Sequence, residues 1–324
     1  MKWSGLKKEF QYIIVAIIVI FFAFVPLFGS TYAITLSSTI MMYIVMASCW
    51  NMFSGPAGYI SLASGAFVGL GFYASGFLST RFPLPVLMLA GGLASLVLAV
   101  IIGSITLRLR GVYFTIFTFC LVELVKAVMT WYEIMVVRKR GLNVRNFGPN
   151  AAFYAMLVMV VIALAVVVIV RKTRFGMALT GIGESEDAAA HIGINTTAYK
   201  VSGFAVTAFM MGTVGAVRAT MLNHIDPTSA FNMMFSFLPV LMCVFGGMNT
   251  FLGPIIGAIV FVLLRNSMSG FGPWYLLVLG ALGIAIMLLA PKGVWGNFSQ
   301  YTGVHLFPTR RQFQISDDKE EEKK

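Results

Sequence analysis

Long apolar stretches recur along this sequence at short intervals, and they restrict its possible folds severely. Hydrophobic residues make up 59% of the 324 residues, and charged residues only 11%. A membrane-spanning helix needs roughly 20 predominantly apolar residues, whereas a soluble domain carries about 25% charged residues. The composition therefore excludes a soluble enzyme, a DNA-binding protein and a disulfide-stapled secreted module. It predicts an all-α polytopic membrane protein.

Ten apolar segments can be marked along the chain, and they predict about 8–10 transmembrane helices. The segments are Tyr12–Phe28, Ile34–Phe53, Ile60–Ser79, Leu84–Leu107, Val112–Tyr132, Ala151–Val170, Val201–Leu222, Phe235–Phe245, Phe251–Leu264 and Trp274–Ala290. The first is longer than the roughly 7–15 apolar residues of a signal peptide, so we expect a retained span rather than a cleaved leader. The third is rich in glycine and serine, and the eighth is short. Both are predicted to be broken or re-entrant helices, whose freed backbone needs cover from protein or a water-filled cavity.

The basic residues predict an orientation. Lysine and arginine cluster before the first segment and after the fourth, sixth and tenth segments. With ten crossings these clusters share one face, which the positive-inside rule identifies as the cytoplasm. We expect a cytoplasmic N-terminus over 1–11, a transmembrane domain over 12–296 with a cytoplasmic loop at 171–199, and a cytoplasmic charged tail over 297–324. With the same number of crossings, the basic stretch 138–145 lies on the outer face of the membrane. This placement indicates either an acidic partner on that face or a number of crossings that is wrong by one.

Charged residues inside apolar segments are costly and need an explanation. Glu123 and Lys126 lie three residues apart in the fifth segment, on one helix face. They either neutralise each other or line a polar pathway. Arg218 stands near the outer end of the seventh segment, where its side chain can extend to the membrane surface. Glu123 is the only acidic residue deep in a segment, which argues against a proton-coupled carrier.

No catalytic constellation is found in the sequence. The dipeptide Gly-Lys of a phosphate-binding loop does not occur, and the three histidines stand far apart. We expect no catalytic residue, metal ion or cofactor, and any ATP hydrolysis takes place on a separate subunit. The net charge of +11 reports loop orientation rather than affinity for nucleic acid, so no nucleic-acid partner is expected. We expect membrane lipid to surround the transmembrane part of the chain.

Several motifs resemble those of a known family. The stretches that carry the resemblance are Asn51–Leu62 (Asn-Met-Phe-Ser-Gly-Pro-Ala-Gly-Tyr-Ile-Ser-Leu), Ala66–Tyr73, Arg108–Phe114 (Arg-Leu-Arg-Gly-Val-Tyr-Phe), Gly246–Pro254 (Gly-Gly-Met-Asn-Thr-Phe-Leu-Gly-Pro) and Pro291–Gly296 (Pro-Lys-Gly-Val-Trp-Gly). Between about Ile34 and Gly296 the chain resembles the permease subunits of branched-chain amino-acid ABC transporters of the LivM type.

The resemblance implies a permease subunit of an ATP-binding-cassette importer in a prokaryotic inner membrane. Its expected partners are a second permease subunit in a heterodimer, two cytoplasmic ABC ATPases and an extracytoplasmic binding protein that delivers a small polar solute. Many such permeases carry Glu-Ala-Ala-x3-Gly in the helix that docks on the ATPase. Here Asp187-Ala188-Ala189 and Gly193 match that motif, with Asp in place of Glu, so these residues are expected to couple to the ATPase. A short amphipathic helix is predicted over Glu184–Ile194.

The expected substrate pathway follows the glycine-rich breaks and their polar neighbours. The predicted pathway residues are Asn51, Ser61, Ser64, Gly65, Glu123, Gly246 and Gly247. The resemblance implies branched-chain or related amino acids as cargo. Ile60, Ala63-Ser64 and Asn249 depart from the family pattern, so urea and short-chain amides remain alternative cargoes. A secondary carrier driven by an ion gradient, which would require Glu123, remains the alternative mechanism, ahead of a channel and a membrane enzyme.

Overall fold

The computed structural model describes residues 29–109, 111–138, 140–248 and 250–268, together with Pro26, Gly270 and isolated positions between Trp274 and Trp295. Four predictions concern residues outside these ranges. They are the first apolar segment, most of the tenth segment, the N-terminus over 1–11 and the tail over 297–324.

The described residues confirm the all-α membrane fold. Six helical stretches are long and apolar enough to cross a membrane: α2 (Thr31–Ala57), α4 (Leu84–Thr106), α5 (Val112–Tyr132) continued by the π-helical turn η1 (Glu133–Val137), α6 (Pro149–Lys172), α9 (Thr196–Ala219), and α10 (Pro227–Ala230) continued by α11 (Met234–Gly246). Two shorter apolar helices accompany them, α3 (Ser64–Leu78) and α12 (Gly253–Ser267).

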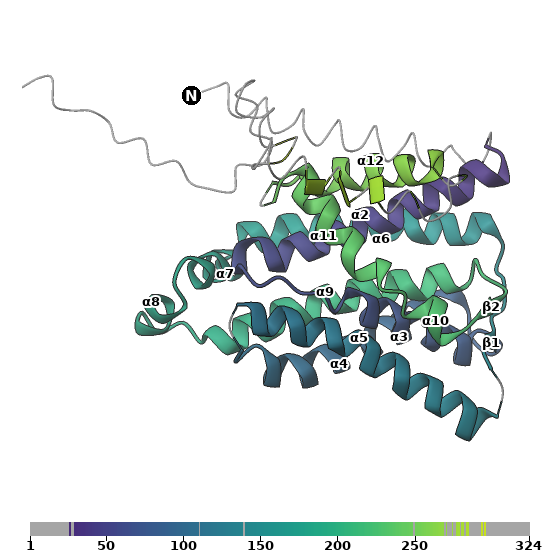
Figure 1. Ribbon diagram of the computed structural model, residues 1–324, viewed down its shortest axis with the longest axis horizontal. Coiled ribbons are helices and arrows are strands. Elements are labelled where there is room, and N and C mark those ends of the chain that lie inside the picture. The colour runs from purple at the N-terminus through teal and green to yellow at the C-terminus, as the bar shows by residue number, and fades with distance from the viewer. Residues whose placement is uncertain are drawn as a thin grey trace, which may run out of the picture.

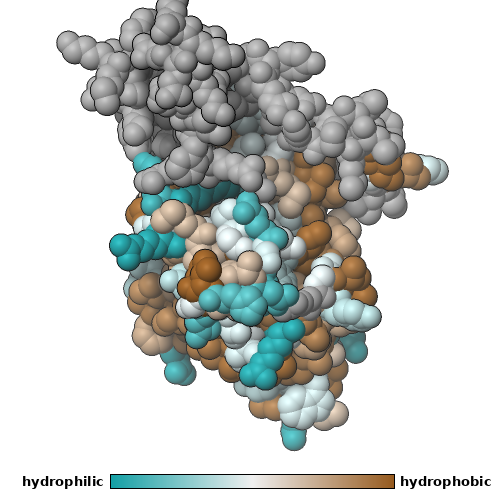
Figure 2. All heavy atoms as spheres, turned by 90° about the vertical axis from the view of Figure 1, so that its left-hand side faces the viewer, coloured by the Kyte–Doolittle hydropathy of each residue, from teal (hydrophilic) through white to brown (hydrophobic). Residues whose placement is uncertain are grey.

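The long helices lie side by side along the longest dimension of the molecule (Figure 1). At one end the chain forms α7 (Arg174–Glu184) and α8 (Glu186–His191), and we call this the α7–α8 end. At the other end β1 (Leu142–Asn143) pairs with β2 (His224–Ile225), antiparallel, with Leu142 opposite Ile225. We call this the β1–β2 end. Figure 2 looks onto the α7–α8 end, where hydrophilic side chains lie across the face and hydrophobic ones flank it.

The bundle has a buried centre and an apolar perimeter. Most of α2 and α9 is buried, whereas most of α4, α5 and α6 is not. α9 packs against α3 and α4, and α2 packs against α6, α9 and α12. The outward side chains of α4 and α5 are large and apolar, among them Leu93, Ile105, Leu124 and Val128. A broad apolar outer face suits the lipid core of a bilayer, and both helices present one, interrupted on α5 by Glu123 and Lys126.

The third predicted segment forms one unbroken helix, α3, so the interruption lies before this helix rather than inside it. The eighth predicted segment also forms one continuous helix, α11. α2 ends at Gly58, whose φ of 72° is left-handed, and α3 begins only at Ser64. The non-helical backbone between them makes three hydrogen bonds with side chains of α2 and α5. Thr115 Oγ1 donates to the Ile60 carbonyl (2.9 Å), Trp50 Nε1 donates to the Ser61 carbonyl (2.7 Å), and the Leu62 amide donates to Thr118 Oγ1 (3.1 Å). These bonds replace the water that this backbone would otherwise need.

Glycines allow two helix pairs to meet backbone to backbone. A Cβ on Gly71 of α3 would overlap the carbonyl oxygen of Gly212 in α9. A Cβ on Gly246 of α11 would overlap the carbonyl oxygen of Gly253 at the start of α12. Small residues at such positions let membrane helices approach closely, where apolar burial alone gives no preference over lipid.

Two segment boundaries differ from the prediction. α9 begins at Thr196 rather than Val201, because Asn195 caps it by accepting a hydrogen bond from the Ala198 amide (3.1 Å). The predicted cytoplasmic loop 171–199 holds two helices, of which only α8 was expected. The sequence Arg174–Glu184 contains three glycines and reads as a loop, but its apolar side chains Ala178, Leu179 and Ile182 are buried against the bundle.

Candidate functional site

α8 forms at the predicted motif. Ser185 caps its first turn by accepting a hydrogen bond from the Ala188 amide (3.3 Å). Gly193 follows its end with a left-handed φ of 87°, and the Ile194 amide donates back to the Ala189 carbonyl (3.1 Å). This is the closing bond of a glycine-terminated helix, so the motif sets both ends of the helix.

The two alanines of the motif face opposite ways. Ala189 is buried against the bundle, whereas Asp187 and Ala188 are exposed. Ile192, just past the helix, is 78% exposed, a large apolar side chain at the tip of the molecule. The outward face of α8 therefore combines a carboxylate, a small residue and an apolar side chain, which suits contact with another protein.

A buried ion pair fastens α8 to the bundle. Lys200 Nζ lies 2.6 Å from Glu186 Oε1, and the side chains of Lys200 and Glu186 are 2% and 18% exposed. Lys200 Nζ also donates to the Leu107 carbonyl (2.7 Å) and to the Tyr59 hydroxyl (3.2 Å). The Tyr59 hydroxyl in turn donates to Glu186 Oε2 (2.6 Å). We call Tyr59, Glu186 and Lys200 the anchor cluster.

The anchor cluster joins four parts of the chain at one point. Glu186 comes from α8, Lys200 from α9, Tyr59 from the non-helical segment before α3, and the Leu107 carbonyl from the end of α4. Charged hydrogen bonds of this kind are short and strong, and they are costly to break when buried. Sequence reasoning did not single out these residues as a site. The available signal was Lys200 itself, a cation near the start of an apolar helix, where the helix dipole disfavours positive charge.

The break between α11 and α12 contacts two of the long helices. The Thr250 carbonyl accepts from Asn51 Nδ2 of α2 (2.9 Å) and from an Arg171 guanidinium nitrogen of α6 (3.3 Å). Thr250 Oγ1 donates to the Gly247 carbonyl (2.8 Å). Three predicted pathway residues, Asn51, Gly246 and Gly247, therefore lie together. Arg171 was counted as a loop residue in the sequence and was missed as a member of this group.

The remaining predicted pathway residues form a second group on another side of α2. Ser61, Ser64 and Gly65 are buried between α2, α5 and α11. The Gly65 amide donates to Ser236 Oγ of α11 (3.0 Å), while Trp50 holds the Ser61 carbonyl. Trp50 and Asn51, adjacent in α2, point to the two different groups. The predicted residues thus flank the same helix instead of lining one continuous surface.

Glu123 belongs to neither group. Its carboxylate pairs with Lys126 Nζ at 3.4 Å along α5, and the two side chains are 42% and 29% exposed. The structure thus forms the ion pair that is the first of the two alternatives for Glu123 and Lys126, and a role of Glu123 in the pathway stays a prediction. The pair lies on the outward side of α5 in this single chain.

Comparison with known proteins identifies relatives along most of the chain. The family model described as the permease component of the branched-chain amino acid transport system matches residues 32–289. The high-affinity branched-chain amino acid transport system permease proteins LivM of Salmonella typhimurium and Escherichia coli are 25% and 24% identical, over 90% of this chain and 76% of each relative. The xylose transport system permease protein XylH of Haemophilus influenzae is 30% identical over 36% of this chain and 32% of its own length. No solved structure matches the chain.

Proposed function

This chain belongs to the family of permease components of branched-chain amino acid transport systems, and from that premise we propose that it is the membrane permease subunit of an ATP-driven importer. It carries a small polar solute, a branched-chain or related amino acid. An extracytoplasmic binding protein delivers the solute, and a second permease subunit completes the path in a heterodimer. Two ABC ATPases supply the energy, and the complex lies in a prokaryotic inner membrane.

In this proposal the α7–α8 end faces the cytoplasm. The basic residues Arg171, Lys172 and Arg174 gather at this end, as the positive-inside rule expects of a cytoplasmic face. The predicted placement of residues 1–11 and 297–324 on the same side follows from the lysines before the first apolar segment. The β1–β2 end then faces outward, and its exposed Arg138, Arg140 and Arg145 offer positive charge to an acidic surface of the binding protein.

α8 is the proposed coupling helix. Its exposed Asp187 and Ala188 would contact the ATPase, while Ala189 and Gly193 fix the packing and the end of the helix. The observation that carries this assignment is the anchor cluster, because it connects the exposed helix directly to the membrane part. A displacement of α8 by the ATPase would move Glu186. Glu186 would pass the movement to Tyr59 in the non-helical segment before α3 and to Lys200 in α9.

The pathway residues are proposed to act where helices are interrupted. Asn51, Gly246 and Gly247 lie at the α11–α12 break, and Ser61, Ser64 and Gly65 lie at the α2–α3 break. Interrupted helices place free backbone groups and small side chains inside a bundle, and transporters use such positions at their substrate sites. Glu123, on the outward side of α5, would contribute only if the second permease subunit covers that side.

The docking surface can be tested by purification from mild detergent. Wild type is compared with a double variant, Asp187→Lys plus Ala188→Leu, which reverses the charge and adds bulk on the exposed face of α8. We expect an ATPase to be recovered with wild type and lost with the double variant. The control is Arg81→Glu, an exposed residue at the β1–β2 end whose charge also reverses.

Two results would contradict the proposal. An ATPase recovered equally with the double variant would exclude the exposed face of α8 as the docking surface. Absence of any ATPase from all samples, with solute uptake intact, would exclude the importer and favour a carrier driven by an ion gradient. Retention of the membrane fold in the double variant is checked by its thermal unfolding.

A further inference from the structure

A second buried carboxylate lies at the β1–β2 end, and the proposed function does not yet use it. Glu133, in the π-helical turn η1, is 2% exposed. The Tyr73 hydroxyl of α3 donates to Glu133 Oε1 (2.6 Å), and the Gly141 amide donates to Glu133 Oε2 (3.0 Å). A buried polar group with its hydrogen bonds in place holds together the elements that supply the donors. Glu133 therefore fastens the residues around Gly141 to α3.

Further contacts join this part of the chain to α3. Residues 133–138 and 140–145, which we call the outer loop, include β1. The Arg145 amide donates to Ser79 Oγ, at the end of α3 (3.1 Å). A Cβ on Gly76 of α3 would lie only 2.9 Å from the Leu142 side chain of β1. The second half of α3 is thus attached to the outer loop by hydrogen bonds and by close packing.

The chain segment that leads into α3 carries a matching hydrogen bond toward the opposite end. Tyr59 stands five residues before α3 and donates to Glu186 Oε2 at 2.6 Å, the same length as the bond made by Tyr73. One continuous stretch, residues 59–73, therefore ends in a tyrosine on either side, and each tyrosine holds a glutamate. The helical part of this stretch spans about 14 Å, roughly half of the 30 Å hydrocarbon core of a bilayer.

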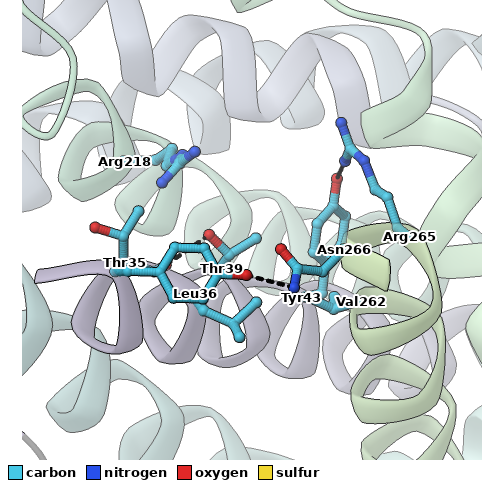
Figure 3. A pocket seen from close by; sticks show the side chains of 9 residues that line it. Thr35, Leu36, Thr39, Tyr43, Arg218, Val262, Arg265 and Asn266 are labelled. Atoms are coloured by element: carbon cyan, nitrogen blue, oxygen red, sulfur yellow. Dashed lines mark hydrogen bonds between the residues drawn. The ribbon is translucent and has the colours of Figure 1, made fainter. Parts of the chain in front are cut away.

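α9 also extends between the two ends, but its polar side chain near the β1–β2 end lies elsewhere. Arg218 lines a cavity of about 240 Å³ between α2, α9 and α12 (Figure 3). None of the described lining residues of this cavity belongs to the outer loop. Where α3 crosses α9, the backbones meet at Gly71 and Gly212, so no side chains interlock at that contact. Small sliding of packed helices is one of the ways in which proteins switch conformation, and this contact does not block it.

We propose that α3 and the segment before it couple α8 to the outer loop, with Tyr59, Tyr73 and Glu133 as positioning residues for transport. The proposal rests on the proposed function, because it connects the surface assigned to the ATPase with the surface assigned to the binding protein. A displacement of α8 reaches Tyr59 through Glu186, α3 carries it across, and Tyr73 passes it to the outer loop. A displacement that starts at the outer loop follows the same contacts back, because coupling between two sites is reciprocal.

The test measures amide hydrogen exchange in the full-length chain in lipid nanodiscs, so it needs no partner protein. The variants are Tyr59→Phe and Tyr73→Phe, each of which removes one hydroxyl group and keeps the ring. Tyr154→Phe is the matched control, because Tyr154 lies on α6 and is 41% exposed. A lost hydrogen bond to a charged group corresponds to about tenfold or more in an equilibrium constant. We therefore expect about tenfold faster exchange of the Gly141 amide in Tyr73→Phe.

The readout that separates coupling from a local structural role is exchange at the far end of α3. We expect Tyr73→Phe to speed exchange of the Ile194 amide, which closes α8, and Tyr59→Phe to speed exchange of the Gly141 amide. Both far-end rates should rise by about fivefold, the lower end of typical coupling factors between two sites. A hydroxyl that only stabilises its own surroundings changes its own end alone. Amides inside α6 and the control Tyr154→Phe should exchange as in wild type.

Three results would overturn the proposal. They are far-end rates that stay unchanged in both variants, a far-end effect in only one direction, and an equal rise within α6, which would indicate general loosening. If Tyr73→Phe does not fold, Glu133→Gln replaces it, with the same expected rise at the Ile194 amide.

ATP hydrolysis and solute uptake by the complete importer are scored separately. Far-end coupling without any ATP-driven uptake contradicts the importer but not the role of α3. Normal ATP-driven uptake with unchanged far-end exchange contradicts the role of α3 but not the importer.

Discussion

Each end of the molecule holds a basic side chain near a terminus of α9, buried in the case of Lys200 and partly buried in the case of Arg218. At the α7–α8 end, Lys200 is enclosed by a carboxylate, a phenol and a backbone carbonyl. At the β1–β2 end, Arg218 faces a cavity and contacts a thioether. Both side chains come from α9, so one helix carries a cation with three oxygen partners near its start and, near its end, a cation whose hydrogen-bond contact among the described residues is a thioether.

The difference indicates what each end does. A buried charge with a complete set of partners fixes the relative position of the elements that supply them. Among the described residues, the hydrogen-bond contact of Arg218 is the thioether of Met221, a weak acceptor that fixes little. The α7–α8 end is therefore built as a joint between α8 and the bundle, whereas the described contacts of Arg218 do not make such a joint.

The largest expected effect comes from breaking the joint. Lys200→Met leaves Glu186 and the Tyr59 hydroxyl without their cation, and removal of one partner from a buried ion pair costs about 3–5 kcal/mol. We expect the free energy of unfolding to fall by that amount, measured by titration with a denaturing detergent in a mild micelle. The double variant Lys200→Met plus Glu186→Met removes both charges and is expected to recover a large part of the loss.

That recovery is the critical comparison. If the double variant is as unstable as the sum of the two single variants, Lys200 and Glu186 do not act as a pair and the joint is not electrostatic. ATPase-coupled uptake gives a second measurement. The double variant is expected to regain stability without regaining uptake, because its α8 would no longer transmit movement to Tyr59.

At the β1–β2 end the same kind of change is expected to have the opposite sign. Arg218→Met removes a cation that has no carboxylate partner among the described residues and keeps an unbranched apolar stem, although the side chain is shorter by the guanidinium group. We expect the free energy of unfolding to stay unchanged or to rise by up to about 2 kcal/mol, since apolar replacement of a buried charge is often stabilising. The same detergent titration measures it. A loss comparable to that of Lys200→Met would show that Arg218 has a strong structural partner and would remove the difference between the two ends.

The sequence predicts the fold well because the membrane restricts it. Long apolar segments can only become helices in lipid, so α4 and α6 appear where their composition places them. The motif at Asp187 likewise predicts α8, because its capping serine and its terminal glycine act locally. α7 was missed because its helix depends on burial of Leu179 against the bundle, which no local pattern reports.

The site was predicted less completely than the fold. Asn51 and Gly247 both contact Thr250, at a glycine-rich break beside a polar residue. The anchor cluster and the contact between Tyr43 and Arg265 were missed because their members lie far apart in the sequence. Tyr59 and Lys200 are 141 residues apart, and Tyr43 and Arg265 are 222 apart. Such contacts depend on how helices pack, and one sequence carries little record of that.

A smaller effect is expected for the half-exposed ion pair on α5. Glu123→Gln removes the partner of Lys126, but both side chains retain access to solvent in this chain. Pairs of this kind on one helix contribute about 0.3–0.5 kcal/mol, so the free energy of unfolding should fall by no more than that. The detergent titration used for Lys200→Met measures both on one scale. A loss of several kcal/mol would mean that a partner protein covers and buries the pair. Unchanged solute uptake by Glu123→Gln would contradict the secondary-carrier mechanism, because that mechanism requires Glu123.

The smallest expected effect concerns Asp226, which caps α10 at the β1–β2 end. Its partial burial acts to raise the pKa of the carboxyl, but hydrogen bonds from Ser229 and Thr228 outweigh it and hold the pKa below its ordinary value of 3.8. A lowered pKa in the folded state stabilises the protein above the ordinary pKa, and this contribution is lost as the pH falls through the folded value. We therefore expect wild type, but not Asp226→Asn, to show this loss of thermal stability as the pH is lowered below 4. The asparagine can still cap the helix, so at neutral pH the two proteins should unfold at nearly the same temperature. If the unfolding temperatures of the two proteins fall in parallel below pH 4, Asp226 does not contribute to the pH dependence of stability. The turn that leads into α11 is then held by packing alone.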